Sequence, residues 1–85
     1  MVNTEQLYQL FLEHPIICTD TRAIQPNCLF FALKGENFDA NTFAESAIAK
    51  GAAYAIIDHA DYQINEQYIL VPDALAALQD LARYH

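Results

Sequence analysis

The chain has 85 residues, which is enough for one compact domain with a small core. Hydrophobic residues make up 54% of it and charged residues 18%, so a lack of apolar side chains cannot leave it disordered. Eleven acidic residues against four basic ones give a formal net charge of -7. Such a surface repels a phosphate backbone, so we expect no nucleic-acid partner.

The two cysteines and the N-terminal residues indicate the compartment. Cys18 and Cys28 are too few for a disulfide scaffold and too far apart for a C-x-x-C pair. We interpret both as reduced, buried thiols of a cytoplasmic protein. The sequence begins without a basic region followed by an apolar run, so no signal peptide is expected. Its apolar stretches are far shorter than the roughly 20 residues that span a bilayer, so we expect no membrane insertion.

Three segments have the pattern of helices. Apolar side chains recur at helical spacing in residues 4–13, and His14-Pro15 ends this helix. The pattern Thr42-x-x-Glu45 predicts a capping box for the second helix, and Gly51 predicts its end. Pro72-Asp73 is expected to cap the third. The side chains expected to face the core are Phe43, Ala47 and Ile48 in the second helix and Leu75, Leu78 and Ala82 in the third.

Four short apolar runs predict strands, at residues 16–19, 28–33, 54–57 and 68–71. Pro26-Asn27 predicts a type II turn before the second strand, and the unbroken apolar run within that strand predicts burial on both faces. The order of elements is helix, strand, strand, helix, strand, strand, helix. We therefore predict an α/β fold with a sheet of about four strands, at least partly parallel and flanked by helices.

Several kinds of catalytic site find little support. The histidines His14, His59 and His85 fall at a helix end, a strand end and the chain terminus, with no nucleophile placed beside them. The segment Asp58-His59, followed by Asp61, is interpreted as a solvated loop rather than a metal site. With Gly35 and Gly51 as the only glycines, neither phosphate-binding glycine motif can be written.

The remaining polar cluster follows the first two predicted strands. It comprises Thr19, Asp20, Thr21 and Arg22 at one strand end and the loop 34–41 at the next, and it holds two of the four basic residues, Arg22 and Lys34. A positive spot on an acidic surface suits a small anionic ligand. The residues alone leave a second interpretation equally open, in which Arg22 pairs with Asp20 or Asp39 and Phe38 anchors the loop.

The stretch 18–58 resembles the N-terminal domain of the Mur ligases, which build the peptide of the peptidoglycan precursor. The resemblance rests on D-[ST]-R at Asp20-Thr21-Arg22, on P-x-x-L-F-x-A-x-x-G at residues 26–35, on D-x-x-x-F at residues 39–43 and on a late G-A at Gly51-Ala52. Within the family, the wording ALKGENFD with D-T-R is most similar to ligases that add D-alanyl-D-alanine to UDP-N-acetylmuramoyl-tripeptide. Ligases that add the third amino acid are the alternative.

The resemblance implies that substrate recognition and ATP binding lie in different domains. Residues 1–85 would be a single N-terminal domain that recognises the UDP-N-acetylmuramoyl-peptide, inactive alone, with the remaining ligase domains as its partners in cis. The central ATP-binding domain and the C-terminal domain would be absent from this chain. No cofactor is expected in this chain, whereas ATP and Mg²⁺ are implied for the full-length ligase.

The resemblance also assigns residues. By motif match, the uridine contacts are Thr19, Thr21, Glu36, Asn37 and Phe38. A further set would either contact the substrate or hold the loop, and for Arg22 we favour the structural role: Arg22, Lys34, Gly35, Asp39 and Asn41. Asn27, Ala40 and Asn41 depart from the family pattern, which has glycine, glycine and histidine at these positions in many members. A stand-alone nucleotide or small-anion binding module and a purely structural interaction domain are the alternatives from other classes.

Overall fold

The structure, a computed structural model, describes residues 4–33 and 43–84. Its helices are α1 (Thr4–Glu13), α2 (Ala44–Ala49) and α3 (Ala74–Tyr84). Its strands are β1 (Ile17–Cys18), β2 (Leu29–Phe31), β3 (Tyr54–Ile57) and β4 (Tyr68–Leu70). Two short 3₁₀ turns, η1 (Thr21–Ala23) and η3 (Ala60–Tyr62), lie in the connections that follow β1 and β3.

All four strands form one parallel sheet in the order β1-β2-β3-β4. In its register, Cys18 lies opposite Phe30, Phe30 opposite Ala55, and Ala55 opposite Tyr68. The α/β class and the four strands are therefore confirmed. The parallel pairing of β2 and β3, the strands on either side of α2, is confirmed as well.

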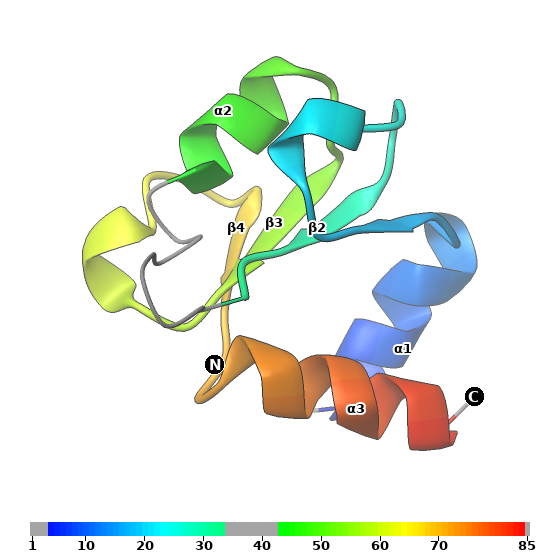
Figure 1. Cartoon of the computed structure of the whole chain (residues 1–85). Coiled ribbons are helices and arrows are strands. Elements are labelled where there is room, and N and C mark those ends of the chain that lie inside the picture. The colour runs from blue at the N-terminus through cyan, green and yellow to red at the C-terminus, as the bar shows by residue number, and fades with distance from the viewer. Residues whose placement is uncertain (1–3, 34–42, 85) are drawn as a thin grey trace.

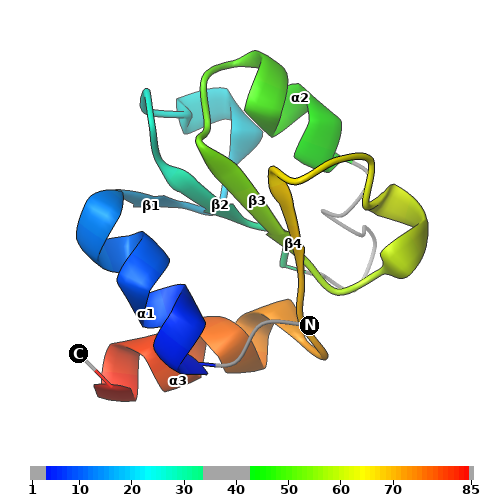
Figure 2. The same cartoon turned by 180° about the vertical axis from the view of Figure 1, so that it is seen from behind.

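The helices cover both faces of the sheet (Figures 1 and 2), as the all-apolar strands predict. α1 and α3 lie together on one face, and α2 lies with η1 on the other. Adjacent residues of one strand therefore belong to different cores: Phe30 packs on the α2 side and Phe31 on the α1 and α3 side, each almost fully buried. The sheet separates the two cores, one on each of its faces.

Two residues with positive φ shape the path of the chain around α2. Asn27 has a φ of 64°, and the Cys28 N–H donates to the Gln25 carbonyl at 3.2 Å, which confirms the turn expected at Pro26-Asn27. Gly51 has a φ of 118° and follows α2 directly. Its N–H donates to Ile48 O and the next N–H to Ala47 O, which together form a Schellman motif. Glycine as the stop of this helix is confirmed.

The predicted inward face of α2 is wrong at Phe43. This residue precedes the helix as its N-cap, makes no side-chain capping bond, and is 45% exposed. Because the helix begins at Ala44, the buried positions are Ala44 and Ala47, and Ile48 packs beside them. Phe43 therefore does not lie on the buried face of α2. Thr42 of the predicted capping box lies outside the described residues.

The predicted apolar stripe of α3 is wrong at Leu75 and Ala82, whereas Leu78 packs on the core as predicted. Leu75 is 50% exposed and Ala82 is exposed, whereas Leu81 is 2% exposed. The stripe that packs on the core consists of Ala74, Ala77, Leu78 and Leu81. α3 packs against α1 as well as the sheet, and this contact selects one of two possible stripes on an alanine-rich helix. The expected cap is confirmed, because Asp73 Oδ1 accepts from the Ala76 N–H at 3.0 Å.

Within residues 4–33 and 43–84, none of the helices combines the length and the apolar character that a bilayer crossing requires.

Candidate functional site

The parallel sheet brings polar residues from several connections to one edge. Thr19 and Asp20 follow β1, and Asp58 follows β3. Since all strands run in the same direction, their carboxyl ends lie at the same edge, where open α/β sheets commonly bind ligands. This edge is the candidate site.

The D-T-R segment is a capped 3₁₀ turn. Asp20 is its N-cap, and Asp20 Oδ1 accepts the Arg22 backbone N–H at 2.9 Å. The Arg22 guanidinium donates to the same carboxylate, from Nε to both oxygens at 3.1 Å and from its terminal nitrogen to Oδ2 at 2.8 Å. These bonds from Arg22, its side chain first, lower the pKa of Asp20 from 3.8 to about 2. The turn is therefore held by an ionised aspartate at neutral pH.

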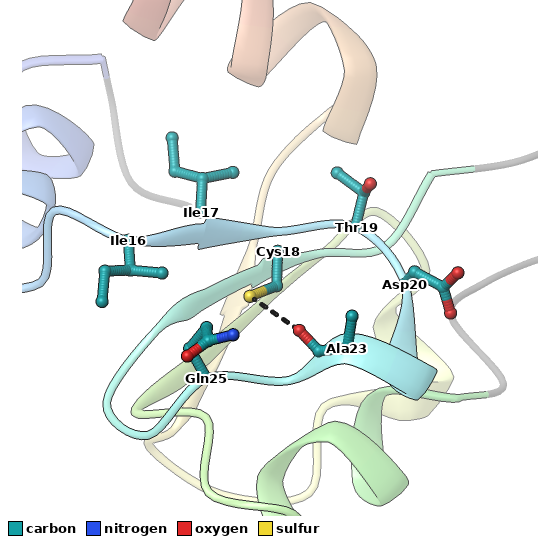
Figure 3. A pocket seen from close by; sticks show the side chains of 7 residues that line it. All are labelled: Ile16, Ile17, Cys18, Thr19, Asp20, Ala23 and Gln25. Carbon is teal, nitrogen blue, oxygen red and sulfur yellow. Dashed lines mark hydrogen bonds between the residues drawn. The ribbon is translucent and has the colours of Figure 1, made fainter.

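The threonines on either side of Asp20, Thr19 and Thr21, lie at different depths. Thr19 is exposed at the end of β1, and its side chain points to the same side of the strand as Ile17, away from Cys18 (Figure 3). Thr21 is the half-buried first residue of η1. The Thr21 carbonyl accepts a 2.9 Å bond from Lys50 Nζ, which comes from the end of α2. The segment is thus tied to a part of the chain 29 residues away.

A hollow of about 300 Å³ opens beside β1 (Figure 3). Its lining mixes apolar side chains with three polar ones, of which Asp20 belongs to the D-T-R segment: Ile16, Ile17, Cys18, Thr19, Asp20, Ala23 and Gln25. The Cys18 thiol turns toward η1 and donates to the Ala23 carbonyl at 3.5 Å. A space of this size beside hydroxyl and carboxylate groups can accept part of a small polar ligand.

Both cysteines are free and buried, as predicted. Cys28 is fully buried, and this burial, followed by the neighbouring Cys18 thiol, raises the pKa of Cys28 to about 11. A thiol with so high a pKa is almost entirely protonated at neutral pH and is a poor nucleophile.

The polar cluster after β3 is engaged with the backbone. Asp58 Oδ2 accepts the Ala74 N–H at the start of α3, at 2.9 Å. His59 Nδ1 accepts the Asp61 N–H at 3.3 Å and caps η3. In the ranges 4–33 and 43–84, no three histidine, cysteine or acidic side chains come together in a way that could hold a metal ion. The capping roles of Asp58 and His59 agree with a structural loop.

Comparisons with known proteins identify the family. The family model described as "Mur ligase family, catalytic domain" matches residues 14–85. The chain belongs to the Mur ligase family. It is 45% identical over 69 residues to the UDP-N-acetylmuramoyl-tripeptide--D-alanyl-D-alanine ligase of Buchnera aphidicola, covering 80% of this chain and 15% of that ligase.

A second branch of the Mur ligase family also matches. The UDP-N-acetylmuramoyl-L-alanyl-D-glutamate--2,6-diaminopimelate ligase of Rickettsia conorii is 33% identical over 79 residues, covering 91% of this chain and 16% of that ligase. Among solved structures, the MurF ligase of Thermotoga maritima in complex with ADP superposes with a TM-score of 0.74 at 25% identity, over 81% of this chain and 16% of that one. The chain spans about 15% of the length of the curated Mur ligases it matches.

The structure describes three of the residues that the Mur ligase resemblance assigns. Thr19, Thr21 and Arg22 lie together at the carboxyl end of β1 and in η1. Arg22 pairs with Asp20 inside its own turn, whereas the role favoured for it, holding Asp39 and the loop, involves residues outside the described ones and stays a prediction. The other assigned residues lie outside the described residues and stay predictions: Lys34, Gly35, Glu36, Asn37, Phe38, Asp39 and Asn41.

Sequence reasoning missed Lys50. It follows α2 and, in sequence, looks like an ordinary cation at a helix end, which would interact only with the helix dipole. Its bond to Thr21 exists because α2 packs beside η1 on the same face of the sheet (Figure 1). No local sequence motif predicts a contact between residues that lie 29 positions apart.

Proposed function

We propose that this chain is the N-terminal domain of a Mur ligase that adds D-alanyl-D-alanine, and that it binds the uridine end of UDP-N-acetylmuramoyl-tripeptide. The observation that carries the choice of branch is the 45% identity to a D-alanyl-D-alanine ligase, against 33% to a diaminopimelate ligase. The preformed D-T-R turn supports the choice of site, because Thr21 and the preceding Thr19 stand at the sheet edge that binds ligands in such folds.

The chemistry of the D-T-R segment suits a uracil ring and its ribose. Uracil presents one N–H donor between two carbonyl acceptors, and a hydroxyl can serve either group as donor or acceptor. The hydroxyls of Thr19 and Thr21 supply this pairing. The bonds from Arg22 to Asp20 hold the turn before ligand arrives, which lowers the cost of ordering the site. Phe38 would stack on the base, with Glu36 and Asn37 beside it.

This chain would recognise the substrate and carry out no bond formation. ATP and Mg²⁺ do not fit the residues present: the two glycines, Gly35 and Gly51, cannot form a phosphate-binding loop, and the described part of the chain holds no cluster of metal ligands. Both would be bound by the remaining domains of the full-length ligase. We place the reaction in the cytoplasm, as part of the synthesis of the peptidoglycan precursor.

A titration of the 85-residue chain with UDP-N-acetylmuramic acid, followed by NMR, tests the proposal. Amide signals of residues 19–22 and 35–41 should shift together and saturate, while ATP at the same concentration should leave them in place. Shifts spread evenly over the surface, or equal responses to ATP, would contradict the uridine site. An unchanged spectrum with all uridine nucleotides would favour a purely structural domain.

The third-amino-acid-adding branch is the alternative, favoured by the match that covers 91% of this chain. The isolated domain cannot separate the two branches, because both would bind the uridine end of a related nucleotide. An assay of the full-length ligase separates them. D-alanyl-D-alanine should be ligated to the UDP-tripeptide, whereas ligation of diaminopimelate or lysine to the UDP-dipeptide would assign the chain to the other branch.

A further inference from the structure

A side-chain hydrogen bond from Lys50, the C-cap of α2, joins the end of this helix to the D-T-R turn. Its Nζ donates to the carbonyl oxygen of Thr21 at 2.9 Å. Thr21 begins η1, and its hydroxyl belongs to the same residue as the bonded carbonyl. A bond to this carbonyl therefore limits how far the hydroxyl can move relative to the sheet.

The backbone that carries Lys50 is itself fixed. The Lys50 N–H donates to Ser46 O and Ala47 O, at 3.0 and 3.2 Å, which closes the last turn of α2. The next carbonyl, that of Gly51, accepts from the Asn27 N–H at 2.8 Å, and the Ala53 N–H donates to Cys28 O at 2.8 Å. The end of α2 is thus joined to the turn that leads into β2. Lys50 extends from a rigid base toward η1.

The charge of Lys50 also acts on the turn. The bonds and the charge of Arg22 lower the pKa of Asp20 most, and the positive charge of Lys50 makes only the smallest contribution in the same direction. Asp20 caps η1 only as an acceptor, so a cation that favours its ionised form favours the capped turn. Lys50 thus supports η1 mainly through its bond to the Thr21 carbonyl, and the effect of its charge on the Asp20 carboxylate is minor.

We propose that Lys50 is a positioning residue of the uridine site, which holds η1 against α2 so that the Thr21 hydroxyl meets the nucleotide in a fixed direction. This inference rests on the proposed function, because Thr21 is assigned to the ligand only there. Lys50 itself does not need to touch the ligand.

Three variants test this role by calorimetric titration with UDP-N-acetylmuramic acid. Lys50→Met removes the ammonium and keeps the apolar stem, and it should raise Kd about three- to tenfold, the range of one ordinary hydrogen bond, because this bond is exposed to solvent. Lys50→Arg keeps charge and donors, and should bind within about twofold of the parent. Arg83→Gln is the matched control: it also removes one positive charge, but Arg83 pairs with Asp80 on α3, across the sheet, so Kd should not change.

A second measurement separates positioning from stability. In the ligand-free Lys50→Met variant, the NMR signals of Thr21 and Arg22 should shift while the melting temperature stays close to that of the parent. Binding is measured well below the lowest melting temperature, so partial unfolding cannot imitate a loss of affinity.

The failure of this inference is distinguishable from that of the proposed function. A parent chain that does not bind uridine nucleotides contradicts the proposed function itself. If the parent binds and Lys50→Met binds equally well, the positioning role is refuted. Equal losses in Lys50→Met and Arg83→Gln would also refute it, because long-range charge would then explain both. A Lys50→Arg variant that binds no more tightly than Lys50→Met would refute the positioning role as well.

Discussion

Arg22 donates to Asp20 from its backbone N–H and from its guanidinium at the same time, two residues along the chain. Both side chains are largely exposed, and exposed ion pairs contribute little to global stability. The effect of this pair is therefore local: the carboxylate accepts both the cap bond and the ion pair, and so fixes the direction of η1. The same bonds therefore also restrict the backbone of the threonines on either side of Asp20.

The first prediction concerns the titration of Asp20. Its folded pKa is lowered from 3.8 to about 2, so its contribution to the turn is complete above pH 4 and is lost as the pH falls through 2. An NMR pH titration of the Asp20 carboxyl should give a midpoint near 2. In Arg22→Gln, which loses the guanidinium, the midpoint should return most of the way to 3.8. A midpoint unchanged by this substitution would show that the pair does not form in solution.

The second prediction tests the phase of α3. Leu81 is 2% exposed and packs in the core formed with α1, whereas Leu75 is 50% exposed. Leu81→Ala should lower the free energy of unfolding by about 2 to 5 kcal/mol. Leu75→Ala removes the same atoms from the same helix and should change it by about 0.5 kcal/mol or less. Urea unfolding of both variants measures this, and equal losses would mean that Leu75 is buried as well.

The sequence was informative wherever the signal is local. The bounds of α1 and β3 agree with the predicted ranges 4–13 and 54–57, because proline ends the helix and a short apolar run defines the strand. The phase of α3 was not predictable in the same way. The segment ALAALQDLARY offers two apolar stripes, one through Leu75 and one through Leu81, and contact with α1 selects the second.

The same distinction holds for the candidate site. The cap of η1 is local, since Asp20 bonds a residue two positions away, and the pairing of Arg22 with Asp20 was one of the interpretations that the sequence left open. The bond from Lys50 to Thr21 joins residues 29 apart, and it depends on α2 and η1 sharing one face of the sheet. Composition and residue spacing cannot predict which two elements lie side by side on one face of the sheet. The bond from Lys50 to Thr21 could therefore be found only in the structure.

The third prediction concerns the positive φ of Gly51. At 118°, this conformation strains any residue with a Cβ, even though the nearest atom to an added Cβ, Pro26 Cα, would lie at an ordinary 3.7 Å. Gly51→Ala should therefore destabilise the fold by about 1 to 3 kcal/mol through the backbone alone. Asn27→Gly is the control, because its φ of 64° suits glycine and stability should change by only a few tenths of a kcal/mol. Thermal melts that show no loss for Gly51→Ala would contradict the observed helix end.

The last prediction uses Thr21 and Phe38 to separate binding from architecture. If the Thr21 hydroxyl bonds the uracil or ribose, Thr21→Val should cost about 1 to 2 kcal/mol of binding free energy, because it removes a hydrogen bond in a half-buried position. Valine keeps the β-branched shape and leaves the carbonyl that Lys50 bonds, so the melting temperature should hardly change.

Phe38 lies outside the described residues, and its assignment rests on the family motif. If its ring stacks on the base, Phe38→Ala should weaken binding by about 1 to 3 kcal/mol and lower stability by less than that. If Phe38 is a core anchor, the free energy of unfolding should instead fall by about 3 to 5 kcal/mol. Calorimetry beside thermal melts distinguishes these outcomes for both variants. Should Thr21→Val and Phe38→Ala both bind like the parent, or should Phe38→Ala only unfold, the loop and η1 serve the fold, and the uridine contacts must lie elsewhere.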